Sequence, residues 1–231
     1  MKKKFLLNKI YLTDCLDGFK KIKNNSIDII ITSPPYNLGN NHHTGFKKHK
    51  PYEDNMEESE YQNWQIKVLD ECFRILKKNG SMFYNHKNRI KNGLQITPYK
   101  WLFKTKFLIK QEIVWINRGQ NFHKIRFYPW TERIYWLVKD KKTKLNNTIN
   151  HHDVFDWKEW KPTGIKGLHT RAFPEKMVED ILSCFPKSKI ILDPFAGSGT
   201  TLVVAKKKKK KFIGFDNNKS YYNLTKKRLY E

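Results

Sequence analysis

Two short segments carry residue types that suit small-molecule binding and group transfer. The first, residues 190–201, reads Ile-Ile-Leu-Asp-Pro-Phe-Ala-Gly-Ser-Gly-Thr-Thr. Gly197 and Gly199 have no Cβ, so the backbone there can approach a ligand closely, and the helix expected after them offers free N–H groups. The segment lacks the lysine that a Walker-type phosphate loop requires. A Gly-x-Gly turn by itself is weak evidence for a nucleotide site, but the nine residues from Asp193 to Thr201 form a far more specific unit.

A second acidic residue strengthens the first segment. Asp216 ends the apolar run that begins at Phe212. It follows Gly199 at about the 20-residue distance at which doubly wound folds place an acid that bonds a ribose hydroxyl. An aspartate at a strand end can also simply cap the next helix, and the sequence leaves both readings open.

The second segment, residues 32–37, reads Thr-Ser-Pro-Pro-Tyr-Asn. Its two prolines predict a stiff turn, because each pyrrolidine ring fixes φ. On such a turn, Ser33 and the carbonyl of Pro34 can present hydrogen-bond acceptors to one small donor, and Tyr36 offers a flat ring. Acceptors beside a ring suit a planar base that carries an amino group. The same residues also fit a rigid turn that packs a tyrosine and binds nothing.

The elements that must position these two loops alternate between strand and helix. Apolar, β-branched runs predict buried parallel strands, and amphipathic spacing predicts helices. The expected strands are 8–14, 27–32, 81–85, 110–116, 131–138, 189–193 and 212–216, and the expected helices are 16–22, 57–77, 174–185, 200–209 and 219–230. We expect the helix over 57–77 to end at Asn79-Gly80. The alternation predicts an α/β fold with a mostly parallel sheet.

Charge indicates a polyanionic partner. The chain has 46 Lys and Arg against 22 Asp and Glu, a formal net charge of +24. Such a surface neutralises phosphates and releases counterions, which drives binding to nucleic acid. Part of the lysine excess also fits the codon usage of an AT-rich genome.

Other features of the sequence exclude several classes. No apolar run reaches the roughly 20 residues that span a bilayer. Three cysteines far apart argue against a disulfide scaffold and for the cytoplasm. The pairs His42-His43 and His151-His152 are adjacent and lack the spacing of metal ligands, so we expect DNA contact or solvation there and no metal site.

Together the two loops resemble the catalytic and cofactor motifs of the DNA amino-methyltransferases that make N4-methylcytosine and N6-methyladenine. The segments 69–83 and 169–178 are similar to further parts of that family, so the resemblance covers most of the chain. The catalytic motif comes first, as in the family's β class of bacterial restriction-modification enzymes. The resemblance implies a circularly permuted Rossmann-like methyltransferase fold with helices on both faces of the sheet. It also implies one catalytic domain over 1–231, with an inserted target-recognition region at about 117–168.

The resemblance assigns roles residue by residue. Ser33, Pro34, Pro35 and Tyr36 are the implied catalytic residues. The implied contacts to S-adenosylmethionine are Asp14, Phe173, Pro174, Glu175, Asp193, Pro194, Phe195, Gly197, Ser198, Gly199, Thr200, Thr201 and Asp216. Asp216 stands where glutamate is commoner, and Asn218 stands where a further acid is usual.

The implied reaction requires a base that swings out of duplex DNA. Tyr36 stacks on that base, and Ser33 and the Pro34 carbonyl accept hydrogen bonds from its amino group, whose nitrogen then attacks the methyl group in line. The expected contacts to DNA are Arg118, Lys124, Arg126, Lys158 and Lys161. Of the tryptophans at 130, 157 and 160, we expect most to be core residues. Residues 37–56 are expected to close over the base.

Ser33 favours cytosine N4 over adenine N6, since many adenine enzymes of the family carry Asp or Asn there. A methyltransferase-like protein that binds DNA without catalysis is the rival hypothesis, and an RNA or protein amine is a weaker alternative. A cognate restriction endonuclease and a homodimer are further partners that the family suggests.

Overall fold

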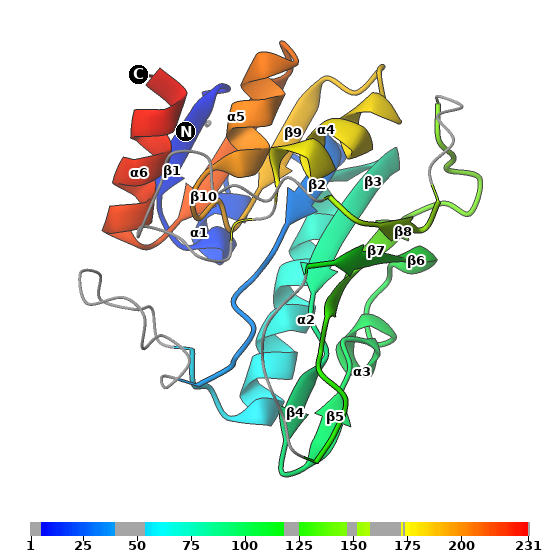
Figure 1. The fold of residues 1–231 in the computed structure, drawn as a ribbon. Coiled ribbons are helices and arrows are strands. Elements are labelled where there is room, and N and C mark those ends of the chain that lie inside the picture. The colour runs from blue at the N-terminus through cyan, green and yellow to red at the C-terminus, as the bar shows by residue number, and fades with distance from the viewer. Residues whose placement is uncertain are drawn as a thin grey trace.

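The computed structural model describes residues 6–39, 54–117, 125–146, 152–157, 172 and 174–230. Its centre is an eight-stranded sheet in the order β1-β10-β9-β2-β3-β7-β6-β8 (Figure 1). The strands, in that order, are Lys9–Leu12, Lys211–Asp216, Ile190–Asp193, Ile27–Thr32, Leu76–His86, Thr131–Val138, Leu108–Ile116 and Val154–Phe155. In this sheet β7 runs antiparallel to both of its neighbours, and the other pairings are parallel. The predicted mostly parallel α/β sheet is therefore confirmed.

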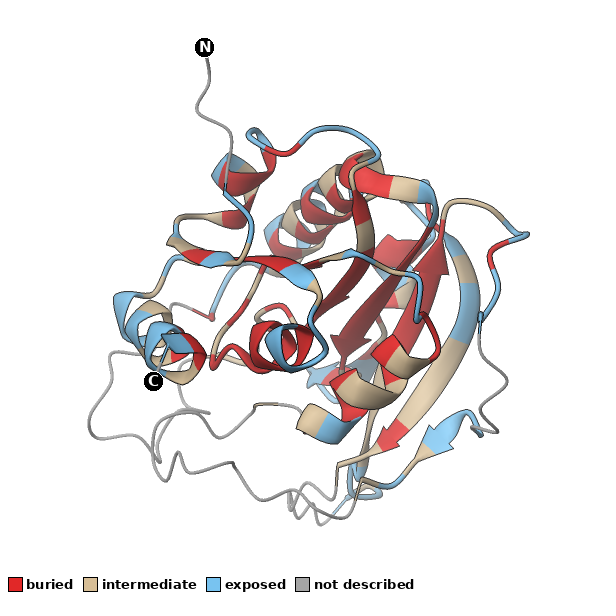
Figure 2. Ribbon diagram, turned by 90° about the horizontal axis from the view of Figure 1, so that it is seen from above, coloured by how far each residue is buried: buried red, intermediate tan, exposed pale blue. Residues whose placement is uncertain are grey.

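Helices cover both faces of the sheet, as predicted. One face packs against α1 (Cys15–Phe19), α2 (Glu58–Ile75) and α3 (Tyr99–Leu102). The other packs against α4 (Glu175–Ser183), α5 (Thr200–Lys207) and α6 (Lys219–Tyr230). Figure 2 shows the inner strands buried and the helices buried on the side that faces them. Every second side chain of a strand points to each face, so one sheet fills two cores.

The expected boundary between α2 and the next strand is wrong. The helix ends at Ile75, and Leu76 already has extended backbone as the first residue of β3. Leu76 is fully buried and pairs with Ile27 of β2, so burial and strand pairing prevail over helical periodicity there. Gly80 lies inside β3, where a Cβ would come within 2.8 Å of the Asp28 carbonyl oxygen. Gly80 therefore allows the close packing of β3 against β2 and does not end the helix.

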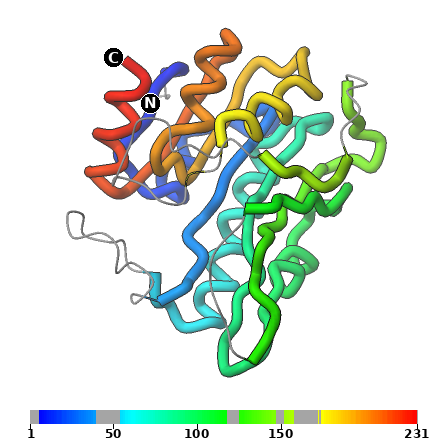
Figure 3. Tube along the Cα trace, in the orientation of Figure 1, coloured from blue at the N-terminus to red at the C-terminus, as the bar shows by residue number. Residues whose placement is uncertain are grey.

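The strand order shows how the two loops meet. The loop after β2 and the loop after β9 leave neighbouring parallel strands at their carboxyl ends, which is where open α/β sheets bind ligands. Figure 3 shows the consequence for the chain path: α6, near the C-terminus, lies beside β1, near the N-terminus. The Pro-Pro loop after β2 precedes the glycine loop after β9 in sequence, and the two lie side by side because β2 pairs with β9.

Three smaller features complete the described structure. A hairpin of β4 (Arg89–Lys91) and β5 (Leu94–Ile96) stands apart from the main sheet. The range 117–168 contains β7, which lies inside the main sheet and is paired on both edges. Within the described residues, no helix is long and apolar enough to cross a membrane.

Candidate active site

A buried hydrogen bond joins the two predicted loops. Thr32, the last residue of β2, donates its hydroxyl to Asp193 Oδ1 of β9 at 2.7 Å. Asp193 also accepts from the backbone N–H of Phe195, which shapes the turn after β9. Burial raises the pKa of Asp193 to about 6, although bonds from Thr32, Thr201 and the Phe195 N–H oppose that shift. The first residue of the Pro-Pro loop is thus fixed against the first residue of the glycine loop.

The sequence predicted that the glycines of this turn let a ligand approach the backbone, and the structure shows that Gly199 also serves close packing against α6. Gly197 and Gly199 have φ of 53° and 80°, a region that other residues rarely adopt. A Cβ on Gly199 would lie 2.5 Å from Thr225 Cγ2 of α6. The Thr225 hydroxyl donates to the Gly197 carbonyl at 2.8 Å, so α6 holds the turn from behind. Ser198, Thr200 and Thr201 are buried, and they anchor the turn to the body of the protein.

The acid at the end of β10 faces the glycine turn. Asp216 accepts from the backbone N–H of Gly197 and from that of Asn218, both at 2.8 Å. Burial raises the pKa of Asp216 to about 6, with the backbone bonds opposing the shift. Asp14 lies one strand further along, after β1, where it caps α1 by accepting from Leu16 N–H at 2.8 Å. Both acids therefore lie at the carboxyl edge of the sheet, beside the turn.

Glu175 has strong partners within the chain. At the start of α4 it accepts from Arg228 of α6 at 2.8 Å and also pairs with Lys207 of α5. Arg228 donates in turn to the Ser198 carbonyl at 2.6 Å. Pro174 caps α4 with extended backbone and is buried. In this structure Glu175 ties α4, α5 and α6 to the glycine turn.

The hydroxyls of the Pro-Pro loop are hydrogen-bonded, directly or through one another, to a carboxylate that the sequence did not single out. Ser33 Oγ lies 2.7 Å from the Tyr36 hydroxyl, which donates to Glu132 Oε2 of β7 at 3.1 Å. Asn85, near the end of β3, donates to the same hydroxyl at 2.8 Å and to Glu132 Oε2 at 3.0 Å. Asn117 donates to the other carboxylate oxygen at 2.8 Å. We call these five residues the Glu132 cluster.

One acceptor of the Glu132 cluster is free within the described structure. Asn85 is 2% exposed, and its Oδ1 has no hydrogen-bond partner among the described residues. A buried acceptor without a partner costs about 1–3 kcal/mol. An N–H group of a bound molecule would remove that cost.

A second buried network supports the loop from the side of α2. The Tyr61 hydroxyl donates to the Pro35 carbonyl at 2.7 Å and lies 2.7 Å from His86 Nε2. The His86 ring packs on the Tyr36 ring, with 4.6 Å between centroids. Burial lowers the pKa of His86 to about 3, so its ring is neutral. Tyr36 is 6% exposed, so its phenol is held between His86 and Glu132.

Sequence reasoning missed Tyr61, Asn85, His86 and Glu132. Asn85 and His86 had a signal, because they follow an apolar strand at the edge where β2 also ends. Glu132 had no such signal in the sequence. It lies at the start of β7, and the start of β7 reaches the carboxyl ends of the parallel strands only because β7 pairs antiparallel with β3. Local pattern does not show which strand runs antiparallel.

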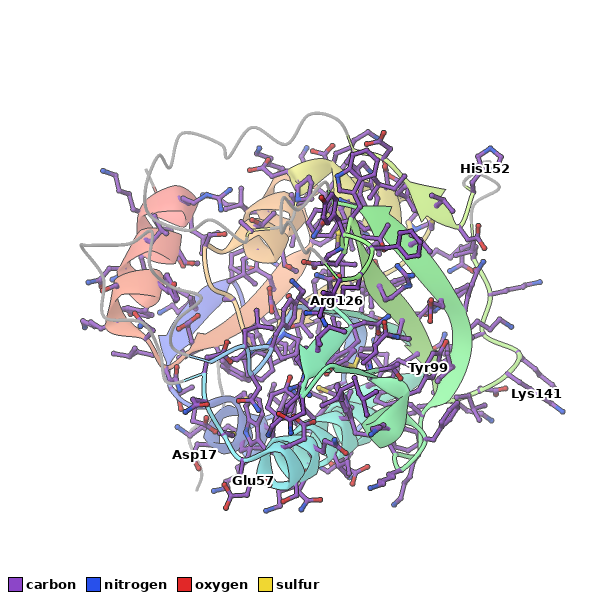
Figure 4. The ribbon with its side chains drawn as sticks, turned by 60° about the horizontal axis from the view of Figure 1, so that its bottom comes forward. Asp17, Glu57, Tyr99, Arg126, Lys141 and His152 are labelled. Atoms are coloured by element: carbon purple, nitrogen blue, oxygen red, sulfur yellow. The ribbon has the colours of Figure 1, made fainter. Side chains whose placement is uncertain are left out.

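Several predicted contacts lie outside the described residues. These are Arg118, Lys124, Lys158, Lys161 and Phe173, together with most of the loop 37–56. Arg126 is described and half-buried, and Figure 4 shows it near the middle of that view, far from Lys141. The expectation of a core role holds for Trp157, which packs on Phe155, but is wrong for Trp130, which is 53% exposed. The described residues contain no cluster of side chains suited to a metal ion.

Comparison with known proteins agrees with this geometry. The family model for N6 and N4 DNA methylases matches residues 27–227. The chain is 30% identical to DNA adenine methyltransferase YhdJ of Escherichia coli over 94% of this chain and 80% of that protein. It is 29% identical to type II methyltransferase M.BglII of Bacillus subtilis, over 94% of this chain and 68% of that protein.

Among solved structures, the cytosine-N4-specific PvuII DNA methyltransferase has the same fold. It is 21% identical, with a TM-score of 0.80 over 99% of this chain and 88% of that one. TTHA0409 of Thermus thermophilus, solved with S-adenosyl-L-methionine, is 19% identical, with a TM-score of 0.70 over 96% of this chain and 92% of that one. By the extent of the family match, this chain belongs to the N6/N4 DNA methylase family.

Proposed function

We propose that this protein transfers a methyl group from S-adenosylmethionine to the exocyclic amino group of a flipped DNA base, with cytosine N4 as the preferred target. The observation that carries the proposal is the 2.7 Å bond between Thr32 and Asp193. It fixes a loop of hydrogen-bond acceptors directly beside a glycine turn suited to a nucleoside. Donor and acceptor of a methyl group must meet in this way, because the transfer is in line.

The residues of the glycine turn fit S-adenosylmethionine. The turn offers backbone without Cβ at Gly197, and Asp216 stands beside it as an acceptor for ribose hydroxyls. Asp193 and Asp14 add acidic groups at the same edge for the cationic and amino parts of the molecule. The bound cofactor supplies an activated methyl group on a sulfonium centre. Phe195, half-buried and packed edge-on to Trp64, is the described aromatic residue of the turn.

The catalytic loop acts by position and hydrogen bonding. Ser33 Oγ and the Pro34 carbonyl accept from the target amine, which directs the nitrogen lone pair toward the methyl group. Asn85 Oδ1 is a third acceptor close by, and its lack of a partner among the described residues supports a contact with the base. Tyr36 lies beneath this site. The tight contacts of its ring and hydroxyl favour a fixed wall over a mobile stacking platform.

DNA binding is supported by the segment that leads into β7. Four large apolar side chains of this segment are at least half exposed: Ile125, Phe127, Tyr128 and Trp130. Arg126 lies among them, and Glu132 of the active site follows directly. Exposed aromatic residues beside a base site suit contact with the stack that a flipped base leaves. With Arg118, Lys124, Lys158 and Lys161, this segment is the proposed DNA-reading part of the region 117–168.

The choice of base rests on Ser33. Relatives of both kinds match this chain, since YhdJ is an adenine enzyme by name and the PvuII enzyme is cytosine-N4-specific. Serine at position 33 favours cytosine N4, and adenine N6 is the alternative. Mass spectrometry of nucleosides from DNA treated with the protein and S-adenosylmethionine decides between them. N6-methyladenine without N4-methylcytosine would refute the preference, and no methylated base would refute catalysis.

Partners and location follow the same reasoning. We place the protein in the cytoplasm beside the DNA, consistent with three free, buried cysteines. A cognate restriction endonuclease and a homodimer are proposed from the family alone. Co-transcription with an endonuclease and light scattering of the purified protein would test the two separately.

A further inference from the structure

The Glu132 cluster has a fixed direction of hydrogen bonding. A carboxylate only accepts, so the Tyr36 hydroxyl gives its single proton to Glu132 Oε2. The phenol oxygen then accepts from Asn85 Nδ2 at 2.8 Å and from Ser33 Oγ at 2.7 Å. Ser33 is therefore the donor in its bond to Tyr36. Asn85 Nδ2 also donates to Ser33 Oγ, at 3.5 Å. The second lone pair of Ser33 is left for the incoming amine.

Methylation of an amine ends with the loss of a proton, and a chain of hydroxyls that ends on a carboxylate can take that proton up. As the amine nitrogen bonds to the methyl carbon, the methyl–sulfur bond breaks with its electron pair on sulfur, and the nitrogen gains a positive charge. One of its two protons must then leave. Ser33 is the group that touches that amine in the proposed function, but a serine hydroxyl has no tendency to keep an extra proton. It can accept one only if it passes its own proton on.

We propose that Glu132 receives the proton released by the target amine, through Ser33 and Tyr36. The amine proton moves to Ser33 Oγ, the Ser33 proton moves to the Tyr36 hydroxyl oxygen, and the Tyr36 proton moves to Glu132 Oε2. Every oxygen in the chain keeps its proton count except Glu132, which becomes a carboxylic acid. Glu132 is half-buried and returns the proton to water between turnovers. This proposal rests on the proposed function, and it makes Glu132 a positioning and relay residue.

The surrounding groups leave Glu132 as the acceptor. Burial raises the pKa of Tyr36 well above 10, and the charge of Glu132 adds to the shift, so a free tyrosinate does not form. Burial likewise raises the pKa of Tyr61 well above its usual value. His86 stays neutral because burial lowers its pKa to about 3. Arg133, next in sequence, has its Nε paired with Glu112 at 2.8 Å.

The test compares Glu132→Gln with a matched pair elsewhere on the sheet. Glu112 of β6 accepts from the Tyr99 hydroxyl at 2.6 Å, so it is also a tyrosine–glutamate pair, with no link to Ser33. Tyr99 is labelled in Figure 4. In Glu132→Gln, the amide oxygen can still accept the hydrogen bond from Tyr36. The new NH2 group then faces Asn117, whose amide must turn to present its oxygen. The variant therefore keeps the hydrogen bond to Tyr36 but removes the group that can accept a proton. Glu112→Gln makes the same chemical change away from the site.

The assay is a single-turnover measurement of methyl incorporation into unmethylated genomic DNA, with enzyme in excess and saturating labelled S-adenosylmethionine, from pH 5 to 9. We expect Glu132→Gln to lower the rate about 100-fold, which is within the usual contribution of a proton acceptor. Tyr36→Phe breaks the same chain, so the double variant should be no slower than the slower single variant. Glu112→Gln should keep the wild-type pH profile of the rate, and Glu132→Gln should change it.

Three outcomes overturn the relay. One is a wild-type rate for Glu132→Gln. Another is a slow Glu132→Gln enzyme with the wild-type pH profile, which means a structural role. The third is a double variant whose loss is the product of the single losses. Absence of methylation by the wild-type protein in the same assay overturns the proposed function itself, so the two failures are distinguished.

Discussion

Replacing Gly199 by alanine adds one methyl group where the structure has no room for it. The backbone there has φ of 80°, and the new Cβ would lie 2.5 Å from Thr225 Cγ2 and 2.7 Å from Thr225 Oγ1. Thr225 cannot simply turn away, because its hydroxyl donates to the Gly197 carbonyl and its side chain is fully buried.

Two costs add in this variant. Left-handed backbone costs an alanine about 1–2 kcal/mol, and overpacking a dense site costs about 1–3 kcal/mol more. We therefore expect the free energy of unfolding to fall by about 2–5 kcal/mol. For a chain of this size that lowers the melting temperature by roughly 5–15 °C. S-adenosylmethionine binding should weaken as well, because the same turn faces Asp216.

Gly93 provides the matched control. It has φ of 78° in the hairpin of β4 and β5, and a Cβ there would meet nothing within 4 Å. Gly93→Ala should show the backbone cost alone, about 1–2 kcal/mol. The difference between the two variants, measured by urea unfolding, gives the cost of the contact with Thr225.

A double-mutant cycle completes the test. Thr225→Ala removes the two atoms nearest the new methyl group, Cγ2 and Oγ1, and leaves Cβ at 3.0 Å. It should recover part of the loss caused by Gly199→Ala, so the two changes together should cost less than their sum. If Gly199→Ala is no more destabilising than Gly93→Ala, or if the cycle shows no coupling, the steric reasoning is refuted.

Two further predictions concern the remaining parts of the site. S-adenosylmethionine affinity, measured by calorimetry, should be constant above pH 7 and weaken as the pH falls through about 6. Asp216 and Asp193 take up protons there and lose their negative charge and part of their capacity as acceptors. Affinity independent of pH from 5 to 8 would contradict those roles. Tyr61→Phe removes the 2.7 Å hydrogen bond to the Pro35 carbonyl. The methylation rate should fall about tenfold and the free energy of unfolding by about 1–2 kcal/mol, with cofactor affinity unchanged. A normal rate would show that the loop holds its shape without Tyr61.

Much of this protein could be predicted from local sequence. The apolar runs at 27–32 and 131–138 match β2 and β7 residue for residue, and the helix at 219–230 matches α6. Such segments are predictable because a strand or helix buried on one side must repeat its apolar residues at a fixed period. The glycine turn and the Pro-Pro loop were predictable for a different reason, since Gly199 and the two prolines restrict the backbone directly.

Only the tertiary structure decided what surrounds the catalytic loop. Nothing near Ser33 in sequence points to Glu132, which lies 3.1 Å from the Tyr36 hydroxyl because an antiparallel strand brings its amino end to the carboxyl edge of the parallel ones. The buried support from Tyr61 and His86 likewise depends on how α2 and β3 pack together. Sequence by itself therefore determined the two loops to which we assign methyl-transfer chemistry. Strand order and direction decided which acids and amides bind the hydroxyls of Ser33 and Tyr36. The sequence does not show these partners, because contacts between distant segments leave no local pattern.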